Sequence, residues 1–264
     1  MRWRKTWIFL ALLIAAVAGL YVAGREPTRT PAPIAPLAAH GNFSGPIFVV
    51  GGTRGTGLEI VRIMRRRGDR VAALVRPGSD AAALEQLGVR VILGDALNPA
   101  DLAAAFASER FAAVVSTLGT RSRDERRPDF EGNRNLFEAA KTAGVRRVVL
   151  VTVIGAGDSE GTGPWLARRF LARIIALKTQ AEDALRGSGL DYTIIRPGGL
   201  IDRPAERHAF LTEDRAAFSW ITRSDLAELT VRALDDPQTV NKVYHAFDPT
   251  RTRFWSIFQQ IGAN

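Results

Sequence analysis

The sequence predicts an α/β fold in which helices cover both faces of a doubly wound parallel β-sheet. From residue 46 onward, short runs of β-branched and apolar residues alternate with longer helical stretches. The first such run leads directly into a glycine-rich turn and then into a helix. Strands that alternate with helices pair in parallel through right-handed crossovers, and 264 residues suffice for one large core of this kind.

The elements follow from this alternation. Seven strands are expected where short β-branched runs occur, at residues 47–50, 70–75, 89–93, 112–116, 147–153, 192–196 and 242–247. Six helices fill the intervals, at residues 57–67, 81–87, 99–107, 130–143, 165–186 and 224–234. Pro164 stands where the fifth helix begins, a place at which proline is tolerated because the first helical N–H has no partner.

Residues 1–24 are predicted to form a transmembrane anchor or a signal peptide. Arg2, Arg4 and Lys5 precede an uncharged apolar run over residues 6–23, which as a helix would be ~27 Å long, close to the hydrocarbon thickness of a bilayer. An Ala-Val-Ala triplet at residues 16–18 resembles a cleavage site and keeps the signal peptide open. The anchor interpretation predicts a single-pass membrane protein, and the side of the membrane stays open because basic residues flank both ends of the run.

Residues 25–43 are predicted to be a linker. Prolines recur there at positions 27, 31, 33 and 36, so we expect an extended, semi-stiff tether that carries no core. The folded domain is then expected over residues 44–264.

The composition excludes several classes of site. Because the chain has no cysteine, it has no disulfides, thiolate nucleophiles or cysteine-bound metals. Its three histidines are scattered, so no metal site is expected. The net charge of +9 favours anionic partners such as phosphorylated cofactors and lipid head groups. The alternative is that the basic residues form a solvated face without a partner. No recognisable nucleic-acid module is present, and nucleic acid is not an expected partner.

The turn after the first strand is predicted to bind the phosphates of a dinucleotide. Gly51 permits a tight turn, Gly55 lets the backbone approach a pyrophosphate, and Gly57 lets the helix pack close to the strand. The helix N-terminus adds free N–H groups and the positive end of its dipole. This context is typical of a Rossmann-type fold, and it places cofactor contacts at Gly51, Thr53, Arg54, Gly55, Thr56 and Gly57.

The cofactor is predicted to be NADP(H) rather than NAD. NAD-binding proteins usually place an acidic residue at the end of the second strand, where it accepts hydrogen bonds from the ribose. Here the strand ends in Arg76, and Arg54 lies in the turn. Two guanidinium groups can hold a 2′-phosphate through charge-assisted hydrogen bonds. The alternative is that either arginine only solvates the rim.

Several motifs together resemble the atypical short-chain dehydrogenase/reductases, an NAD(P)H-binding group that includes NmrA-like and biliverdin reductase B-like proteins. The resemblance covers roughly residues 46–248, and its motifs lie at residues 51–57, 74–76, 94–96, 118–121 and 188–199. It implies further cofactor contacts, which are Asp95 and Ala96 beside the adenine, Ser116, Thr117 and Leu118 after the fourth strand, and Pro197 and Gly198 at the nicotinamide. It also implies that Arg121 lies near the substrate.

The catalytic pattern of the wider superfamily is incomplete. In that pattern a tyrosine four residues before a lysine exchanges a proton with the substrate. Lys178 is present, and the resemblance implies that it binds the nicotinamide ribose, but position 174 is Ile174. Thr152 is the only hydroxyl near the position of the expected serine. Glu182, one turn after Lys178, is expected to pair with it, either within the site or as a surface ion pair.

These observations leave two functions open. The first is an NADPH-dependent reductase of a small hydrophobic or aromatic acceptor, flavin- or quinone-like, because such acceptors tolerate a missing proton donor. The second is a non-catalytic NADP(H)-binding protein that senses redox state or supports assembly at a membrane. The helix that begins at residue 165 is apolar on one face and basic on another, so it could rest on an anionic membrane or simply pack with its arginines in water.

Overall fold

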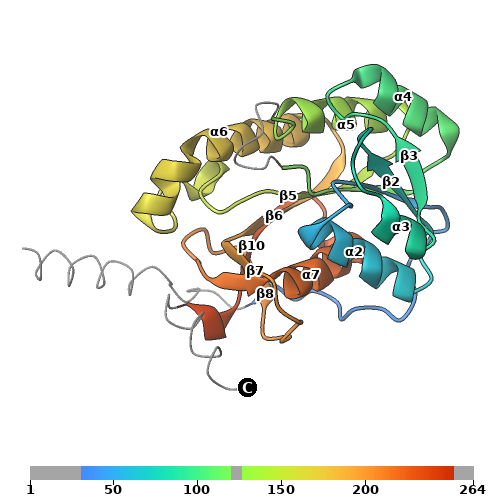
Figure 1. Ribbon diagram of the computed structural model, residues 1–264. Coiled ribbons are helices and arrows are strands. Elements are labelled where there is room, and N and C mark those ends of the chain that lie inside the picture. Colours follow the sequence, from blue (N-terminus) through green and yellow to red (C-terminus); the bar gives the residue numbers. More distant parts are fainter. Residues whose placement is uncertain (1–30, 120–126, 253–264) are drawn as a thin grey trace, which may run out of the picture.

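The computed structural model describes residues 31–119 and 127–252, which form the predicted doubly wound parallel sheet with helices on both faces (Figure 1). Strands pair in the order β3-β2-β1-β4-β5-β6-β10-β8. The seven predicted strands are confirmed as β1 Ile47–Val50, β2 Val71–Val75, β3 Arg90–Leu93, β4 Ala113–Ser116, β5 Arg147–Val151, β6 Asp191–Pro197 and β10 Lys242–Phe247. The six predicted helices are confirmed as α2 Gly55–Arg66, α3 Ala82–Gln86, α4 Pro99–Ser108, α5 Glu131–Thr142, α6 Trp165–Gly187 and α7 Arg223–Asp235.

The two helical layers follow from the alternation of side chains along the strands. Ile47 and Val49 of β1 point into the core beneath α2, α3 and α7, whereas Phe48 and Val50 point into the core beneath α4, α5 and α6. Figure 1 shows these helices on the two faces of the sheet. All four are buried. A parallel strand covered on both faces is apolar at every position, which is why the run over residues 47–50 shows no polar alternation.

Three short strands were not predicted. β8 (Phe210–Thr212) pairs antiparallel with β10 at one edge of the sheet, and β7 (Gly199–Ile201) pairs with β9 (Trp220–Thr222) in a small separate sheet. Each is three residues long, too short for a periodic pattern in the sequence. The 3₁₀ turns η1 Gly157–Ser159, η2 Pro237–Thr239 and η3 Pro249–Arg251 complete the described elements.

The segment 31–43 corrects the prediction of a linker that carries no core. It has no helix or strand, as expected, but it lies against the domain. The Ala32 N–H donates to the Leu211 carbonyl at 2.9 Å, and the Ala35 N–H donates to the Asp236 carboxylate at 2.9 Å. Ala32, Ile34, Leu37 and Phe43 pack against the core beneath α2 and α7. Proline-rich composition predicts the extended conformation, but it does not reveal these docking contacts.

The N-terminal prediction lies outside the described residues. None of the helices within residues 31–119 and 127–252 combines the length and the apolar character of a membrane span. Residues 1–24 are not among them, so the anchor or signal peptide stays a prediction.

Candidate cofactor-binding site

The glycine-rich turn forms a cradle that only glycine can build. Gly51 has φ +90° and Gly55 φ +53°, both in the left-handed region. A Cβ on Gly57 would lie 2.2 Å from the Gly51 carbonyl oxygen, so the first turn of α2 packs directly on the end of β1. The helix begins at Gly55, two residues earlier than predicted, and its first N–H groups therefore belong to the turn itself.

The end of β4 closes the cradle from the side. The Thr117 hydroxyl donates to the Gly51 carbonyl at 3.0 Å, and the Thr117 N–H donates to the Val50 carbonyl at 2.9 Å. A Cβ on Gly51 would lie 2.7 Å from the same hydroxyl oxygen. Thr117, predicted as a cofactor contact, thus holds the turn in shape.

The cradle suits an anion. Arg54 is the N-cap residue of α2, and its side chain accepts no hydrogen bond from the first turn of the helix. Arg54 therefore does not satisfy the first backbone N–H groups of α2. The buried Thr56 hydroxyl has no hydrogen-bond partner within residues 31–119 and 127–252. A buried hydroxyl without a partner is costly, and a phosphate oxygen at the helix N-terminus would satisfy it. The helix N-terminus and the Thr56 hydroxyl therefore fit a pyrophosphate. Thr53, another predicted cofactor contact, lies in the same turn.

Three arginines lie in the turn, beside it, or at the end of the neighbouring strand β2, and the sequence predicted two of them. Arg54 is exposed in the turn, and Arg76 is exposed just beyond the end of β2, the strand that pairs with β1. Arg223 was missed: a Cβ on Gly55 would lie 3.7 Å from its Nη1. Arg223 is the first residue of α7, and its Nε donates to Asp202 at 2.7 Å. No local pattern could have found it, because α2 and α7 are far apart in the sequence.

The predicted adenine contacts lie in a tightly bonded loop between β3 and α4. The Asp95 N–H donates to the Asp101 carboxylate at 2.8 Å, and the Leu97 N–H donates to the Asp95 carboxylate at 2.9 Å. The Asn135 side chain donates to the carbonyl of Ala96, which is buried, at 3.1 Å. Asp95 and Ala96 therefore hold fixed positions at the carboxyl edge of the sheet, where Rossmann-type folds bind nucleotides.

Ser116 and Leu118 form a wall after β4. The buried Ser116 hydroxyl donates to the Asn133 side-chain oxygen at 2.6 Å and accepts from the Leu118 N–H at 3.4 Å. The Asn133 amide donates in turn to the Asp129 carbonyl at 2.7 Å. The wall is therefore tied to the start of α5.

Lys178 reaches this wall from α6. Its ammonium group donates to the Leu118 carbonyl and lies 3.5 Å from an Asp129 carboxylate oxygen. Burial lowers the pKa of Lys178, and the Asp129 charge opposes that shift. Glu182 was the expected partner; among the described residues the direct ion pair of Lys178 is instead with Asp129, and Glu182 contributes only a longer-range attraction that also opposes the lowering of the pKa of Lys178. The Lys178–Asp129 pair is buried rather than on the surface. Asp129 was missed because it lies 49 residues before Lys178.

A family model described as NAD(P)H-binding matches residues 51–237, the span that carries all of this geometry. This chain is a member of the NAD(P)H-binding family. Among curated relatives, the uncharacterised sugar epimerase YhfK of Bacillus subtilis is 30% identical over 77% of this chain and 93% of its own length. The NAD(P)H azoreductase of Xenophilus azovorans is 31% identical over 77% of this chain and 68% of its own length.

Two further comparisons bear on this NAD(P)H-binding protein. The photosystem II assembly factor Ycf39 of Synechocystis is 27% identical over 75% of this chain, which spans 61% of that relative. The solved structure of ChuY, an anaerobilin reductase from Escherichia coli O157:H7, superposes with a TM-score of 0.70 at 30% identity, covering 77% of this chain and 97% of ChuY.

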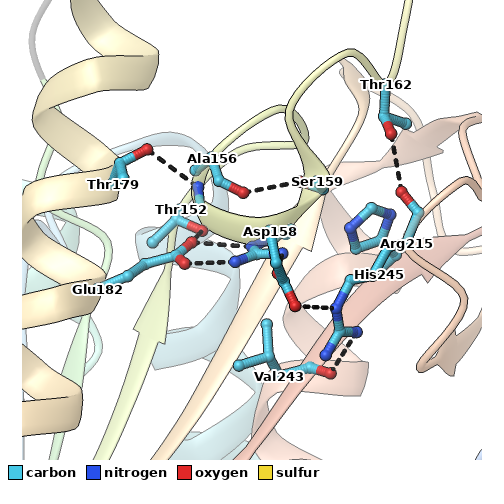
Figure 2. A network of polar contacts seen from close by, with 12 residues as sticks. Thr152, Ala156, Asp158, Ser159, Thr162, Thr179, Glu182, Arg215, Val243 and His245 are labelled. Atoms are coloured by element: carbon cyan, nitrogen blue, oxygen red, sulfur yellow. Dashed lines mark hydrogen bonds and ion pairs between the residues drawn. The ribbon is translucent and has the colours of Figure 1, made fainter.

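A network of ion pairs, buried at Glu182 and Arg196 and exposed at Asp158, joins α6, β6 and η1 (Figure 2). Arg196 of β6, fully buried, donates to both carboxylate oxygens of Glu182 at 2.9 and 2.5 Å and also donates to Asp158. Arg215 donates to the other Asp158 oxygen at 2.9 Å. Arg196 directly follows the buried apolar pair Ile194 and Ile195, and an arginine at such a position was the signal in the sequence that a carboxylate faces it.

Thr152 belongs to this network. Its hydroxyl donates to Glu182 at 2.7 Å, and the side chain is buried (Figure 2). Because its only proton is held by Glu182, the hydroxyl cannot at the same time donate to a substrate carbonyl. The predicted substrate contact at Thr152 therefore requires that this bond break or that Thr152 act only as an acceptor.

The predicted nicotinamide contacts lie at the end of β6. The Pro197 carbonyl accepts from the Ile154 N–H at 2.9 Å, and a Cβ on Gly198 would lie 2.1 Å from the Ser219 carbonyl oxygen. Gly198 is thus required for the close approach of two chain segments. Arg121, the predicted substrate contact, lies outside the described residues.

Proposed function

We propose that this protein is an NADPH-dependent reductase that acts on a hydrophobic or aromatic acceptor of the flavin or quinone type. The observation that carries the choice of cofactor is Arg76, exposed at the end of β2 where an NAD-specific protein would place a carboxylate. Support for reduction comes from two relatives, which are named as an azoreductase and an anaerobilin reductase.

The proposed roles follow from the positions of the side chains. The turn over residues 51–57 holds the pyrophosphate, and Arg54 and Arg76 hold the 2′-phosphate. Lys178, buried beside Leu118 and Asp129, positions the nicotinamide ribose. When bound, the reduced nicotinamide supplies the hydride. Arg121 is proposed to lie at the substrate end.

The source of the proton narrows the class of acceptor. Ile174 stands where the wider superfamily has its tyrosine, and the Thr152 proton is held by Glu182. We therefore assign no side chain as proton donor, and water or the substrate supplies the proton. A flavin or a quinone accepts a hydride without prior protonation of a carbonyl oxygen by the protein, whereas a simple ketone gains much more from such a donor.

The test is turnover by the full chain in detergent, with NADPH and a panel of flavins, quinones, azo dyes and simple ketones. We expect NADPH oxidation with at least one aromatic acceptor and none with the ketones. Calorimetry with NADPH runs in parallel. Heat of binding without turnover on any acceptor would contradict the reductase, and no heat with NADPH or NADH would contradict the cofactor site as well.

A second candidate is a non-catalytic NADP(H)-binding protein that senses redox state or supports assembly at a membrane. The missing tyrosine favours it, as does the similarity to a relative named as an assembly factor. The predicted anchor over residues 1–24 would place either candidate at a membrane. Protease treatment of the full chain in sealed vesicles tests that placement. Protection of the domain that is lost when the membrane is dissolved supports the anchor. Release of the whole protein from the vesicles into solution contradicts it.

A further inference from the structure

The first half of α6 exposes a large apolar surface. Trp165 is 70% exposed and Phe170 79%, with Leu166 at 49% and Leu171 at 38%. In Figure 1 these first turns of α6, drawn in yellow, project beyond the sheet. The sequence left open an ordinary packed helix with only its arginines in water, and that alternative is wrong, because the apolar side chains also face solvent.

Leu171 continues the face by which α6 packs on the domain, and Phe170 and Leu166 border that face. Trp165 lies on the other side of the helix and is not part of this face. Spacings of three and four residues place side chains on one face of a helix. Along α6 this face runs through Ala167, Leu171, Ile174, Lys178, Ala181 and Leu185. From Lys178 onward it is buried, whereas nothing within the described residues covers Ala167 and Leu171. The same helix face thus leaves the core and remains uncovered.

Basic side chains border this surface. Arg169 and Arg173 are exposed, one turn apart, and each lies three residues after an exposed apolar residue, Leu166 or Phe170. Aromatic side chains beside arginines are typical of helices that lie in the interface of an anionic membrane, where the apolar stems are buried and the guanidinium groups reach the phosphates. We propose that residues 166–174 dock, through the side of the helix that carries Leu166, Phe170 and Leu171, on the surface of an anionic lipid bilayer.

The path of the chain is consistent with this docking. Ala32 is bonded to Leu211, and the Thr162 hydroxyl donates to the carbonyl of Arg215 at 2.7 Å. Leu211 and Arg215 are only four residues apart, at most ~14 Å of extended chain. The N-terminal segment therefore joins the domain at the same end as the start of α6. Residues 25–31 span at most ~25 Å, so a membrane anchor ahead of them would keep α6 close to the bilayer.

The chain offers a direct test because it contains no cysteine. Ala167 and Ala172 are both exposed, and five residues place them ~140° apart around the helix. Ala167→Cys and Ala172→Cys, each carrying a nitroxide, are compared in the full chain reconstituted into bilayers of phosphatidylcholine with or without phosphatidylglycerol. With phosphatidylglycerol present, we expect the label at 167 to collide with oxygen in lipid and the label at 172, on the side of the helix that carries Trp165, to collide with a water-soluble nickel chelate. Without phosphatidylglycerol, both labels should reach the chelate.

Two outcomes would overturn the proposal. One is equal accessibility of both labels to the nickel chelate in anionic bilayers. The other is protection of position 167 with dipolar broadening between labels, because that result identifies a second copy of the chain as the partner. Arg169→Gln with Arg173→Gln, expected to weaken docking about fivefold per arginine, should abolish the dependence on phosphatidylglycerol. NADPH binding is independent of this result, so failure of docking leaves the proposed reductase untouched.

Discussion

At the scale of single residues, Arg76 is the proposed point at which the protein distinguishes NADPH from NADH. A 2′-phosphate is present only in NADPH, and Arg76→Asp replaces its expected partner by a like charge. Hydrogen bonds to charged groups contribute about 1.5–3 kcal/mol, so NADPH affinity should fall roughly 10- to 150-fold while NADH affinity changes little. Calorimetric titration with both nucleotides measures this ratio.

The matched control is Arg66→Asp, at the far end of α2. Arg66 is also exposed, and its replacement changes the net charge by the same amount. We expect it to leave the ratio of the two affinities unchanged. Equal losses of NADPH and NADH in Arg76→Asp would refute the assignment of Arg76 to the 2′-phosphate.

Arg223 should behave differently, because it lies beside Gly55 in the turn that is proposed to hold the pyrophosphate. Both cofactors share that group, so Arg223→Met should weaken NADPH and NADH by the same factor, roughly tenfold or more. Asp202→Asn is the control, since it removes the exposed partner of Arg223 and leaves the guanidinium in place. A preference of Arg223→Met for one nucleotide, or a loss in the control as large as in the variant, would argue against this role.

These residues also show what the sequence could predict about the site. The roles of Gly51 and Gly57 were visible because a strand, a turn and a helix are consecutive in the chain. The contacts of Arg223 with the turn and of Lys178 with Asp129 join segments that are distant in sequence. Only the packing of α7 beside α2, and of α6 beside α5, brings those segments together.

At the scale of elements, the longer strands could be predicted from the sequence and the shortest ones could not. Each of the seven predicted strands has at least four residues and a clear apolar run, whereas β7, β8 and β9 have three residues each. Their partners are not neighbours in a repeating strand–helix pattern, so local sequence gives no reason to pair them. Residues 31–43 were missed for the same reason, since their contacts are made with residues such as Leu211 and Asp236.

The ionic network joins α6 to β6, and its central acid can be tested. Glu182→Gln leaves the buried Arg196 with Asp158 as its only carboxylate. Removing one partner of a buried ion pair typically costs about 3–5 kcal/mol. We expect the free energy of unfolding to fall by that order, measured as the shift in urea midpoint of the full chain in detergent.

Asp183→Asn is the matched control, because it neutralises the next residue of the same helix. The Asp183 side chain is 66% exposed, and surface substitutions usually stay within about 0.5 kcal/mol. If both variants lose the same small amount, the network does not stabilise the packing of α6 on β6. If Glu182→Gln also lowers NADPH affinity and Asp183→Asn does not, the position of Lys178 depends on the packing of α6.

At the scale of the whole molecule, one buried histidine couples stability to pH. His245 of β10 is fully buried, its Nδ1 donates to the Ala217 carbonyl at 2.8 Å, and its Nε2 has no partner within the described residues. Burial lowers the pKa of His245 to about 4; the hydrogen bond opposes this shift, while the charges of Arg196 and Arg215 reinforce it. The folded protein therefore keeps this imidazole neutral where an unfolded chain would protonate it.

The sign of the effect follows from the protons that each state binds. Between pH 6.5 and about pH 4 the unfolded chain holds a proton on His245 that the folded chain does not, so the free energy of unfolding falls as pH falls, by up to roughly 3 kcal/mol in total. Burial raises the pKa of Asp158, but Arg215 and Arg196 outweigh it and lower this pKa to about 2, so Asp158 loses its contribution to stability only below pH 3.8. The two windows are thus separate.

His245→Gln removes this titration while its amide can still donate to the Ala217 carbonyl. Urea unfolding at a series of pH values should show a flatter slope between pH 6.5 and about 4 in this variant than in the native chain. His208→Gln, at an exposed position, should keep the native slope. The comparison rests on slopes, so a uniform loss of stability in His245→Gln does not obscure it, whereas an unchanged slope would show that another group causes the acid sensitivity.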